Sequence, residues 1–222
     1  MRNYAVSWGC GIVATAPLFA GHLVFINEIK FILISWFSSF ISTFLLIFCS
    51  LSSLFTKNPW FIFLFSIPFD VVGKVLLKFL ATKLNFFKST KDHMSLGFSC
   101  GLGFALAHVL TLYLPIVFDQ KYSVEIDLSS PDYFPNSLDL ALLNHWMSIF
   151  HISTGLLLFR FSNLFLLAFL ILIIQYGASS MTKIPSLWGK HVAMALTSYL
   201  FVILTLFSYR SMKTKVENKK SN

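Results

Sequence analysis

The chain has 222 residues, of which 56% are hydrophobic and 12% are charged. Soluble globular domains average about 45–50% apolar and about 25% charged residues, so this composition excludes a soluble domain and, because disorder needs low hydrophobicity, a disordered chain. The net charge is +8, from 17 Lys and Arg against 9 Asp and Glu. In a membrane protein such an excess reports topology and requires no nucleic-acid partner, because Lys and Arg collect in cytoplasmic loops.

Seven apolar stretches are long enough to cross a lipid bilayer, which takes about 20 residues per helix. We therefore expect an all-α polytopic membrane protein in which residues 1–209 form a single domain of seven transmembrane helices. The first apolar stretch continues to Ile26, which is too long for a signal peptide, so we interpret it as a retained span. The expected spans cover residues 4–26, 31–55, 60–80, 94–118, two helices between 137 and 183 that meet at a turn over 160–163, and 188–209.

The charges are distributed unevenly over the two sides of the membrane that seven spans define. One side collects 12 of the 17 Lys and Arg residues, whereas the other has 5 and carries a long acidic connection over 119–136. The positive-inside rule then places the N-terminus outside or in the lumen and the C-terminus in the cytosol. The last segment, 210–222, is basic and poor in apolar residues, so we expect a disordered cytosolic tail.

Polar side chains inside the expected spans are the candidates for function, because they are costly in lipid. Asp70 and Lys74 are four residues apart on one helix, the spacing at which opposite charges meet, so we expect them to pair while Lys74 and Lys78 reach toward the cytosol. A proton relay is the alternative, although it would need a second buried carboxylate. The other candidates for polar contacts between helices are His22, His108, Asn144, His145, His151, Gln175 and Tyr176.

These polar residues do not form a catalytic set. An intramembrane aspartyl protease needs two carboxylates, and the spans hold one away from their ends, Asp70. A serine-type protease would pair Ser179 with His191, but the charged residues and the proline between them place His191 at an interface. His145 and His151 lie on different sides of their helix and lack the spacing of a metal-binding pair. The sequence therefore predicts neither an enzyme acting alone nor a cofactor or metal site.

Small residues recur every four positions in the fourth span, at Gly97, Gly101 and Ala105. This spacing stacks them along one side of a helix, where a second helix can approach closely. Packing inside the same bundle and docking of another protein's helix are both consistent with the pattern. Because no catalytic set is present, we expect a docking ridge for a partner helix, with His108 close to the same face.

Five short motifs follow one another along the chain: Trp8-Gly9-Cys10 with Pro17, Asp70-Val71-Val72 with Lys78, Gly101-Leu102-Gly103-Phe104, Ser130-Pro131-Asp132-Tyr133-Phe134, and His151 with Gly155 and Phe159. In order, spacing and expected topology they resemble the anterior pharynx-defective family, the seven-span scaffold subunit of the γ-secretase complex. The resemblance covers most of the chain. Two positions depart from it, because Val109 stands where the family's glycine repeat continues and Gln175 where the family has a second membrane histidine.

The resemblance implies a non-catalytic scaffold and assembly subunit of an intramembrane aspartyl protease complex that cleaves single-span membrane proteins. The implied partners are presenilin-like, nicastrin-like and presenilin-enhancer-like membrane subunits, of which presenilin supplies the catalytic aspartates. The implied location is the endoplasmic reticulum, the Golgi and the endomembrane or plasma membrane. The docking ridge would then serve these partners, while His151 and Gln175 would make polar contacts inside the bundle.

A small transporter or channel is the alternative function. Its polar path would run around Asp70, His108, His151 and Gln175. Broken helices and inverted repeats would support a transporter, and the sequence pattern indicates neither.

Overall fold

A computed structural model describes residues 4–25, 28–56, 59–84, 90–113, 136–161, 164–181 and 186–221 of the protein. All regular secondary structure in these ranges is helical, which confirms the all-α fold class. The elements are α1 (Tyr4–Phe25), α2 (Ile29–Thr56), α3 (Pro59–Lys83), α4 (Thr90–His108), the short π-helix η1 (Val109–Tyr113), α6 (Asn136–Arg160), α7 (Leu164–Met181) and α8 (Leu187–Ser221).

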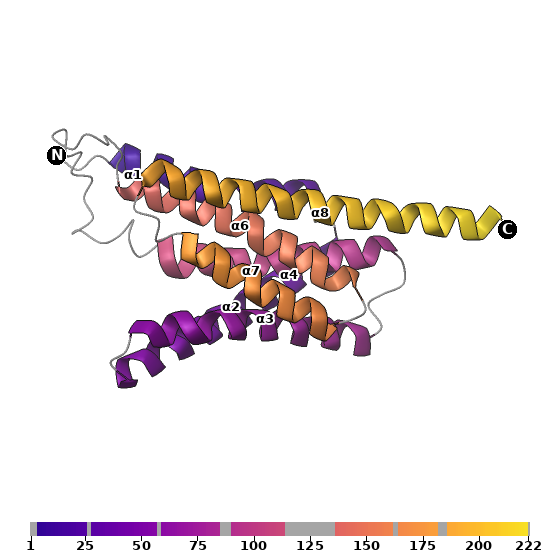
Figure 1. The fold of residues 1–222 in the computed structure, drawn as a ribbon, viewed down its shortest axis with the longest axis horizontal. Coiled ribbons are helices and arrows are strands. Elements are labelled where there is room, and N and C mark those ends of the chain that lie inside the picture. The colour runs from indigo at the N-terminus through magenta and orange to yellow at the C-terminus, as the bar shows by residue number, and fades with distance from the viewer. Residues whose placement is uncertain are drawn as a thin grey trace.

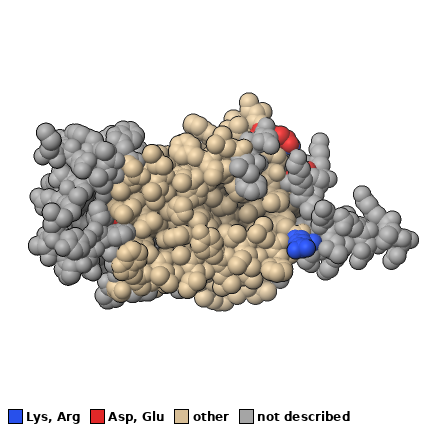
Figure 2. Space-filling view, turned by 90° about the horizontal axis from the view of Figure 1, so that it is seen from above, with Lys and Arg blue, Asp and Glu red and all other residues tan. Residues whose placement is uncertain are grey.

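Four of the described helices contain segments long and apolar enough to span a membrane: Ile29–Cys49, Asp92–Thr111, Leu138–Arg160 and Trp188–Arg210. Two shorter apolar segments, Gly9–Leu23 and Ala168–Gly177, lie in α1 and α7. The middle of the face in Figure 2 carries no Lys, Arg, Asp or Glu among the described residues, as an apolar belt in lipid requires. The protein is therefore an integral membrane protein. The acidic connection over 119–136 lies, apart from its last residue, outside the described residues.

The helices pack around α4. In Figure 1, α1, α6 and α8 run along one side of the bundle and α2 and α3 along the other, with α4 between them; α4 makes its most extensive contacts with α6 and α2. Of the membrane-spanning segment in α4, 67% is buried inside the bundle, against 28% for those in α2 and α8. Helices α2 and α8 therefore turn most of their apolar surface outward, whereas most of α4 is covered by neighbouring helices.

The small-residue ridge of α4 packs against α6 of the same chain. A Cβ atom added to Gly101 would lie 2.6 Å from the carbonyl oxygen of His151 and 2.6 Å from the Cα atom of Ile152. A Cβ atom on Gly97 would lie 3.0 Å from the carbonyl oxygen of Gly155, and Ala105 is fully buried. This corrects the expectation of a partner-docking ridge at Gly97, Gly101 and Ala105. Because lipid gives helices no hydrophobic drive to associate, close backbone contact is used here to join two helices of one bundle.

A second small-residue contact joins α4 to α2. The backbone of Gly103 lies against Ser35 and Ser38, and a Cβ atom there would come within 2.6 Å of the Cβ of Ser38. Four serines of α2 are buried, and their positions at i, i+3, i+4 and i+7 place them on one side of that helix; they are Ser35, Ser38, Ser39 and Ser42. Helix α4 is thus held closely on two sides by residues with little or no side chain.

Lys78 ends up buried at the end of α6. Its Nζ atom donates to the carbonyl oxygen of Leu158 at 2.7 Å and also to that of Phe161. Both oxygens lie in the last turn of α6 or just after it, where carbonyl groups have no partner within the helix. A positive charge is favourable there because the C-terminus of a helix carries partial negative charge. The ammonium group therefore caps α6 and joins it to α3.

The C-terminal segment differs from the expected disordered tail. Helix α8 continues to Ser221 and extends beyond the rest of the bundle in Figure 1. Residues 210–221 contain no Gly or Pro and are rich in Lys, a good helix former, so a helix that begins in the membrane can propagate through them.

The contact between α4 and α6 can be tested by adding one methyl group. Gly101→Ala should destabilise the protein by about 1–3 kcal/mol, because its Cβ would meet backbone atoms that cannot move without separating the helices. Reversible unfolding by SDS in mixed micelles measures this free energy. Gly9→Ala and Gly177→Ala are the matched controls, since no described residue outside the local helical turn has an atom within 4 Å of a Cβ at either position. If Gly101→Ala and these controls lose the same free energy of unfolding, the close contact between α4 and α6 is contradicted.

Candidate functional site

A buried polar network lies at the centre of the bundle and contains Asp70, Lys74, His151, Thr154 and Gln175. The Nζ atom of Lys74 donates to Asp70 Oδ2 at 2.8 Å, to His151 Nδ1 at 3.0 Å and to Thr154 Oγ1 at 3.2 Å. Gln175 Nε2 donates to the same oxygen of Asp70 at 2.9 Å. The most exposed of the five, Asp70, is only 5% exposed. The structure thus brings together four residues singled out from the sequence, Asp70, Lys74, His151 and Gln175, and adds Thr154.

The positions of these residues follow from helix geometry. Asp70 and Lys74 are four residues apart on α3, and His151 and Thr154 are three apart on α6, so each pair lies on one face of its helix. Gln175 comes from α7. Thr154 is oriented by its own hydrogen bond to the carbonyl oxygen of His151 at 3.1 Å. The network therefore joins three helices at a single carboxylate.

The charges in this network balance. A protonated lysine has three donors and no acceptor, and the three donors of Lys74 are matched by Asp70, His151 and Thr154. The ammonium also lies 5.1 Å from the centre of the Phe104 ring on α4. Desolvated charges are tolerated only when paired and hydrogen-bonded, and here one carboxylate faces one ammonium. Lys74 is 1% exposed, so it does not reach toward the cytosol as expected.

His108 joins the network by ring stacking. Its ring centre lies 4.3 Å from that of His151, with the two planes inclined by 31°. His108 is the last residue of α4 and directly precedes the π-helix η1. π-Helical turns inside α-helices occur frequently at functional sites. With His108 stacked on His151, all four residues of the alternative polar path come together in space; they are Asp70, His108, His151 and Gln175.

Asp70, His108 and His151 also form a cluster with the chemistry of a metal site. One donor atom from each lies within 4.8 Å of those from the other two. The sequence grouped these three residues on the alternative polar path but predicted no metal site, because they come from α3, α4 and α6 and share no metal-binding spacing along the chain. However, Lys74 already places a positive charge beside both Asp70 and His151. The carboxylate is therefore neutralised by a side chain of the protein itself.

Three of the remaining candidates from the sequence form hydrogen bonds with backbone carbonyl groups. His22 Nδ1 donates to the carbonyl oxygen of Leu18 at 3.1 Å, and Asn144 Nδ2 to that of Leu140 at 2.9 Å, each within its own helix. His145 Nδ1 donates to the carbonyl oxygen of Val13 at 3.0 Å and so joins α6 to α1. Tyr176 is partly buried on α7. The first three are accounted for by backbone hydrogen bonds.

A second polar cluster, which sequence reasoning missed, joins α6 to α8. Asp139 Oδ2 accepts from Lys190 Nζ at 2.6 Å, and Asp139 Oδ1 lies 2.8 Å from His191 Nε2. Asp139 is in the first turn of α6 and the other two residues are in the first turns of α8. His191 is thus paired with a carboxylate, while the side chain of Ser179 lies outside the described residues. The cluster was missed because Asp139 lies at the very start of its expected span, where an acidic residue needs no buried partner.

Neither a scan of protein-family models nor a search of curated proteins finds a match to this chain. The resemblance to the anterior pharynx-defective family therefore stays a prediction from motifs.

Removing the ammonium of Lys74 tests the ion pair. Lys74→Met should destabilise the protein by about 3–5 kcal/mol, because it leaves the Asp70 carboxylate buried without its cation. The double variant Lys74→Met with Asp70→Asn should recover at least about 1 kcal/mol of that loss, since the charge is then gone. SDS unfolding of both single variants and the double variant gives the coupling free energy. A double variant as unstable as the sum of the two single variants would show that the residues do not interact.

Gln175 offers a test of the hydrogen bond from α7. Gln175→Leu should cost about 1–3 kcal/mol of stability, because Asp70 loses a donor that is buried with it. Gln175→His should cost less, since the imidazole keeps an N–H donor at this position. Unfolding of the two variants under identical conditions ranks them. If the leucine variant is the more stable of the two, the amide is not needed to solvate the carboxylate.

Proposed function

We propose that the protein is a non-catalytic scaffold and assembly subunit of a γ-secretase-type intramembrane aspartyl protease complex, which cleaves single-span membrane proteins. Its partners in this proposal are presenilin-like, nicastrin-like and presenilin-enhancer-like membrane subunits. The chain crosses the membrane seven times, with the N-terminus lumenal and the C-terminus cytosolic. It resides in the endoplasmic reticulum, the Golgi and the endomembrane or plasma membrane.

The main support for this proposal is that the motif residues lie at contacts between helices. Asp70, Lys78, Gly101, His151 and Gly155 belong to motifs up to 85 positions apart in the sequence, and each lies at a contact between two helices. Residues selected for chemistry on a substrate would instead converge on an accessible cleft. Motifs that hold helices together are what a scaffold requires.

The state of Asp70 supports the same interpretation. Aspartyl proteolysis needs two carboxylates that share a proton and act on one water molecule. The expected spans contain one acidic residue away from their ends, and that residue is bound by Lys74 and Gln175. The chain therefore supplies structure to a protease complex, and a presenilin-like partner supplies both aspartates.

Partner helices in such a complex would meet the outward faces of the bundle. The ridge on α4 is covered by α6, so it is closed to them. The outward faces of α2 and α8 carry large exposed apolar side chains, among them Trp36, Phe40 and Phe44 on α2 and Leu196, Ile203 and Phe207 on α8. These faces are available to lipid and to other helices.

The transporter alternative gains one observation, the convergence of Asp70, His108, His151 and Gln175. The contacts among them weigh against an open path, because Asp70 is tied to Lys74 and Gln175 at 2.8 and 2.9 Å. The cavity beside Asp70 has a volume of about 10 Å³, which is room for about one water molecule. A solute would have to break the ion pair to pass.

Affinity purification of the full chain in a mild detergent tests the scaffold proposal. A presenilin-like protein should be recovered with the chain and identified by mass spectrometry. Depletion of the chain should also raise the amount of uncleaved membrane stubs in the cell. Recovery of the chain only as a stable monomer, with no change in the stubs, would contradict the proposal. Solute flux into proteoliposomes that contain the purified chain alone, abolished by Asp70→Asn, would favour a transporter instead.

A further inference from the structure

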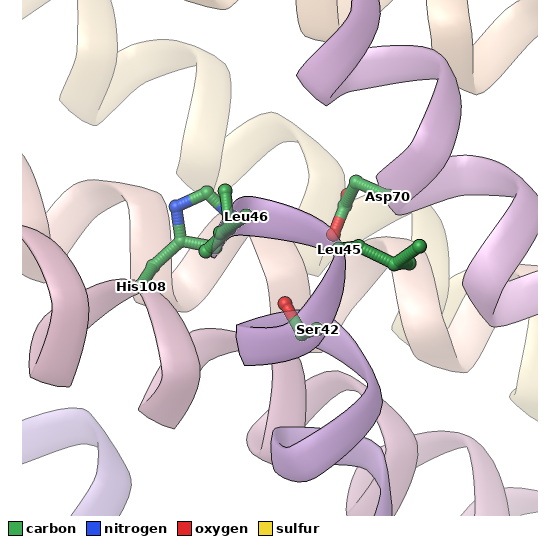
Figure 3. Close-up of a pocket in the computed structure, with 5 residues that line it drawn as sticks. All are labelled: Ser42, Leu45, Leu46, Asp70 and His108. Atoms are coloured by element: carbon green, nitrogen blue, oxygen red, sulfur yellow. The ribbon is translucent and has the colours of Figure 1, made fainter. Parts of the chain in front are cut away.

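A small cavity lies beside the polar network, between α2, α3 and α4. It is lined by Asp70 from α3, His108 from α4, and Ser42, Leu45 and Leu46 from α2. Figure 3 shows Asp70 and His108 entering this region from different helices, with the side chains of α2 around and between them. Its volume of about 10 Å³ matches the roughly 10–15 Å³ that one water molecule needs.

Four buried polar atoms of the network have no hydrogen-bond partner among the described residues of the protein. They are Asp70 Oδ1, His108 Nε2, His151 Nε2 and Gln175 Oε1. Asp70 is 95% buried, and its other carboxylate oxygen accepts two hydrogen bonds, so the carboxylate is solvated on one side only. A buried polar atom without a partner is strongly unfavourable and is normally satisfied by ordered water when the protein supplies nothing.

The same cluster offers donor atoms to a metal ion, so a metal ion is the alternative to water as the ligand. A cation is disfavoured because the ammonium of Lys74 is bound to both Asp70 and His151 and has already neutralised the carboxylate. In addition, His151 accepts from Lys74 at Nδ1, so its neutral ring carries the proton on Nε2 and presents a donor there. His151 therefore has no free lone pair on its ring to offer a metal ion.

The three groups also lie close enough together to share one small ligand, because one donor atom from each of Asp70, His108 and His151 lies within 4.8 Å of the others. This spacing fits a water molecule as well as a metal ion, so the positive charge of Lys74 beside the cluster decides between the two.

We propose that this cavity binds a single ordered water molecule that donates a hydrogen bond to Asp70 Oδ1 and bonds to His108 Nε2. The water completes the solvation of the buried carboxylate and extends the network from α3, α6 and α7 to α4. This inference concerns the chain itself and does not depend on the scaffold function.

Hydroxyl-radical footprinting of the purified full chain, combined with elemental analysis, tests the proposal. Radicals generated from bound water modify the side chains next to it, so Leu45 and Leu46 should be modified several-fold faster than Leu156, which is also partly buried but does not line the cavity. Elemental analysis should find no stoichiometric zinc, iron, copper or cobalt. Equal modification of the three leucines would overturn the proposal, and so would one metal ion per chain.

His108→Phe removes the proposed water partner while keeping an aromatic ring against His151. The modification of Leu45 and Leu46 should then fall to the level of Leu156. His145→Phe is the matched control, because His145 contacts the backbone of α1 and does not line the cavity, and it should leave all three rates unchanged. If Leu45 and Leu46 are modified as fast in His108→Phe as in the wild type, the proposed hydrogen bond between the water molecule and His108 is overturned. If that variant does not fold, the wild-type rates and the elemental analysis still decide whether water occupies the cavity.

Discussion

A carboxylate buried inside a membrane protein has to be neutralised and hydrogen-bonded, and the packing of this bundle depends on how Asp70 meets that requirement. One turn further along α3, Lys74 supplies the cation, and the Gln175 amide on α7 supplies a second donor. A lysine ammonium has three donors, so its other two bonds reach His151 and Thr154 on α6. One negative charge therefore sets the relative positions of three helices. Helices that shifted past one another would leave a desolvated charge without a partner, which is far more costly than losing apolar contact in lipid.

Close contact between helix backbones is the second interaction that stabilises the bundle, in addition to the charged network. Lipid is as apolar as the helices, so helices associate through packing and hydrogen bonds. Helix α4 meets this condition twice, through Gly97 and Gly101 against α6 and through Gly103 against the serine face of α2. The two contacts hold α4 in the middle of the bundle and bring His108, at its end, against His151. The glycine contacts and the charged network therefore stabilise the same arrangement of α3, α4 and α6.

The proposed scaffold function needs a rigid interior and an outer surface that other helices can contact, and these two parts of the bundle are separate. The polar and small residues are turned inward, and the large apolar side chains of α2 and α8 are turned outward. The side chain of Gln175 fits this division of roles. Its amide donates to Asp70, so α7 is joined to the network by a group that does not gain or lose charge.

The sequence by itself determined that the chain is an all-α integral membrane protein and that Asp70 and Lys74 share one helix face, because hydropathy and i,i+4 spacing are local properties. It also identified His151 and Gln175 as candidates for polar contacts, since polar residues in lipid need partners. It could not determine which helix covers the α4 ridge, because Gly97, Gly101 and Ala105 present the same smooth face to any neighbour. Only the tertiary structure assigned that ridge to α6, gathered His108 and Thr154 around the ion pair, and paired Asp139 with Lys190 and His191. These contacts join residues from different helices, and their formation depends on how the whole bundle packs and not on spacing along the chain.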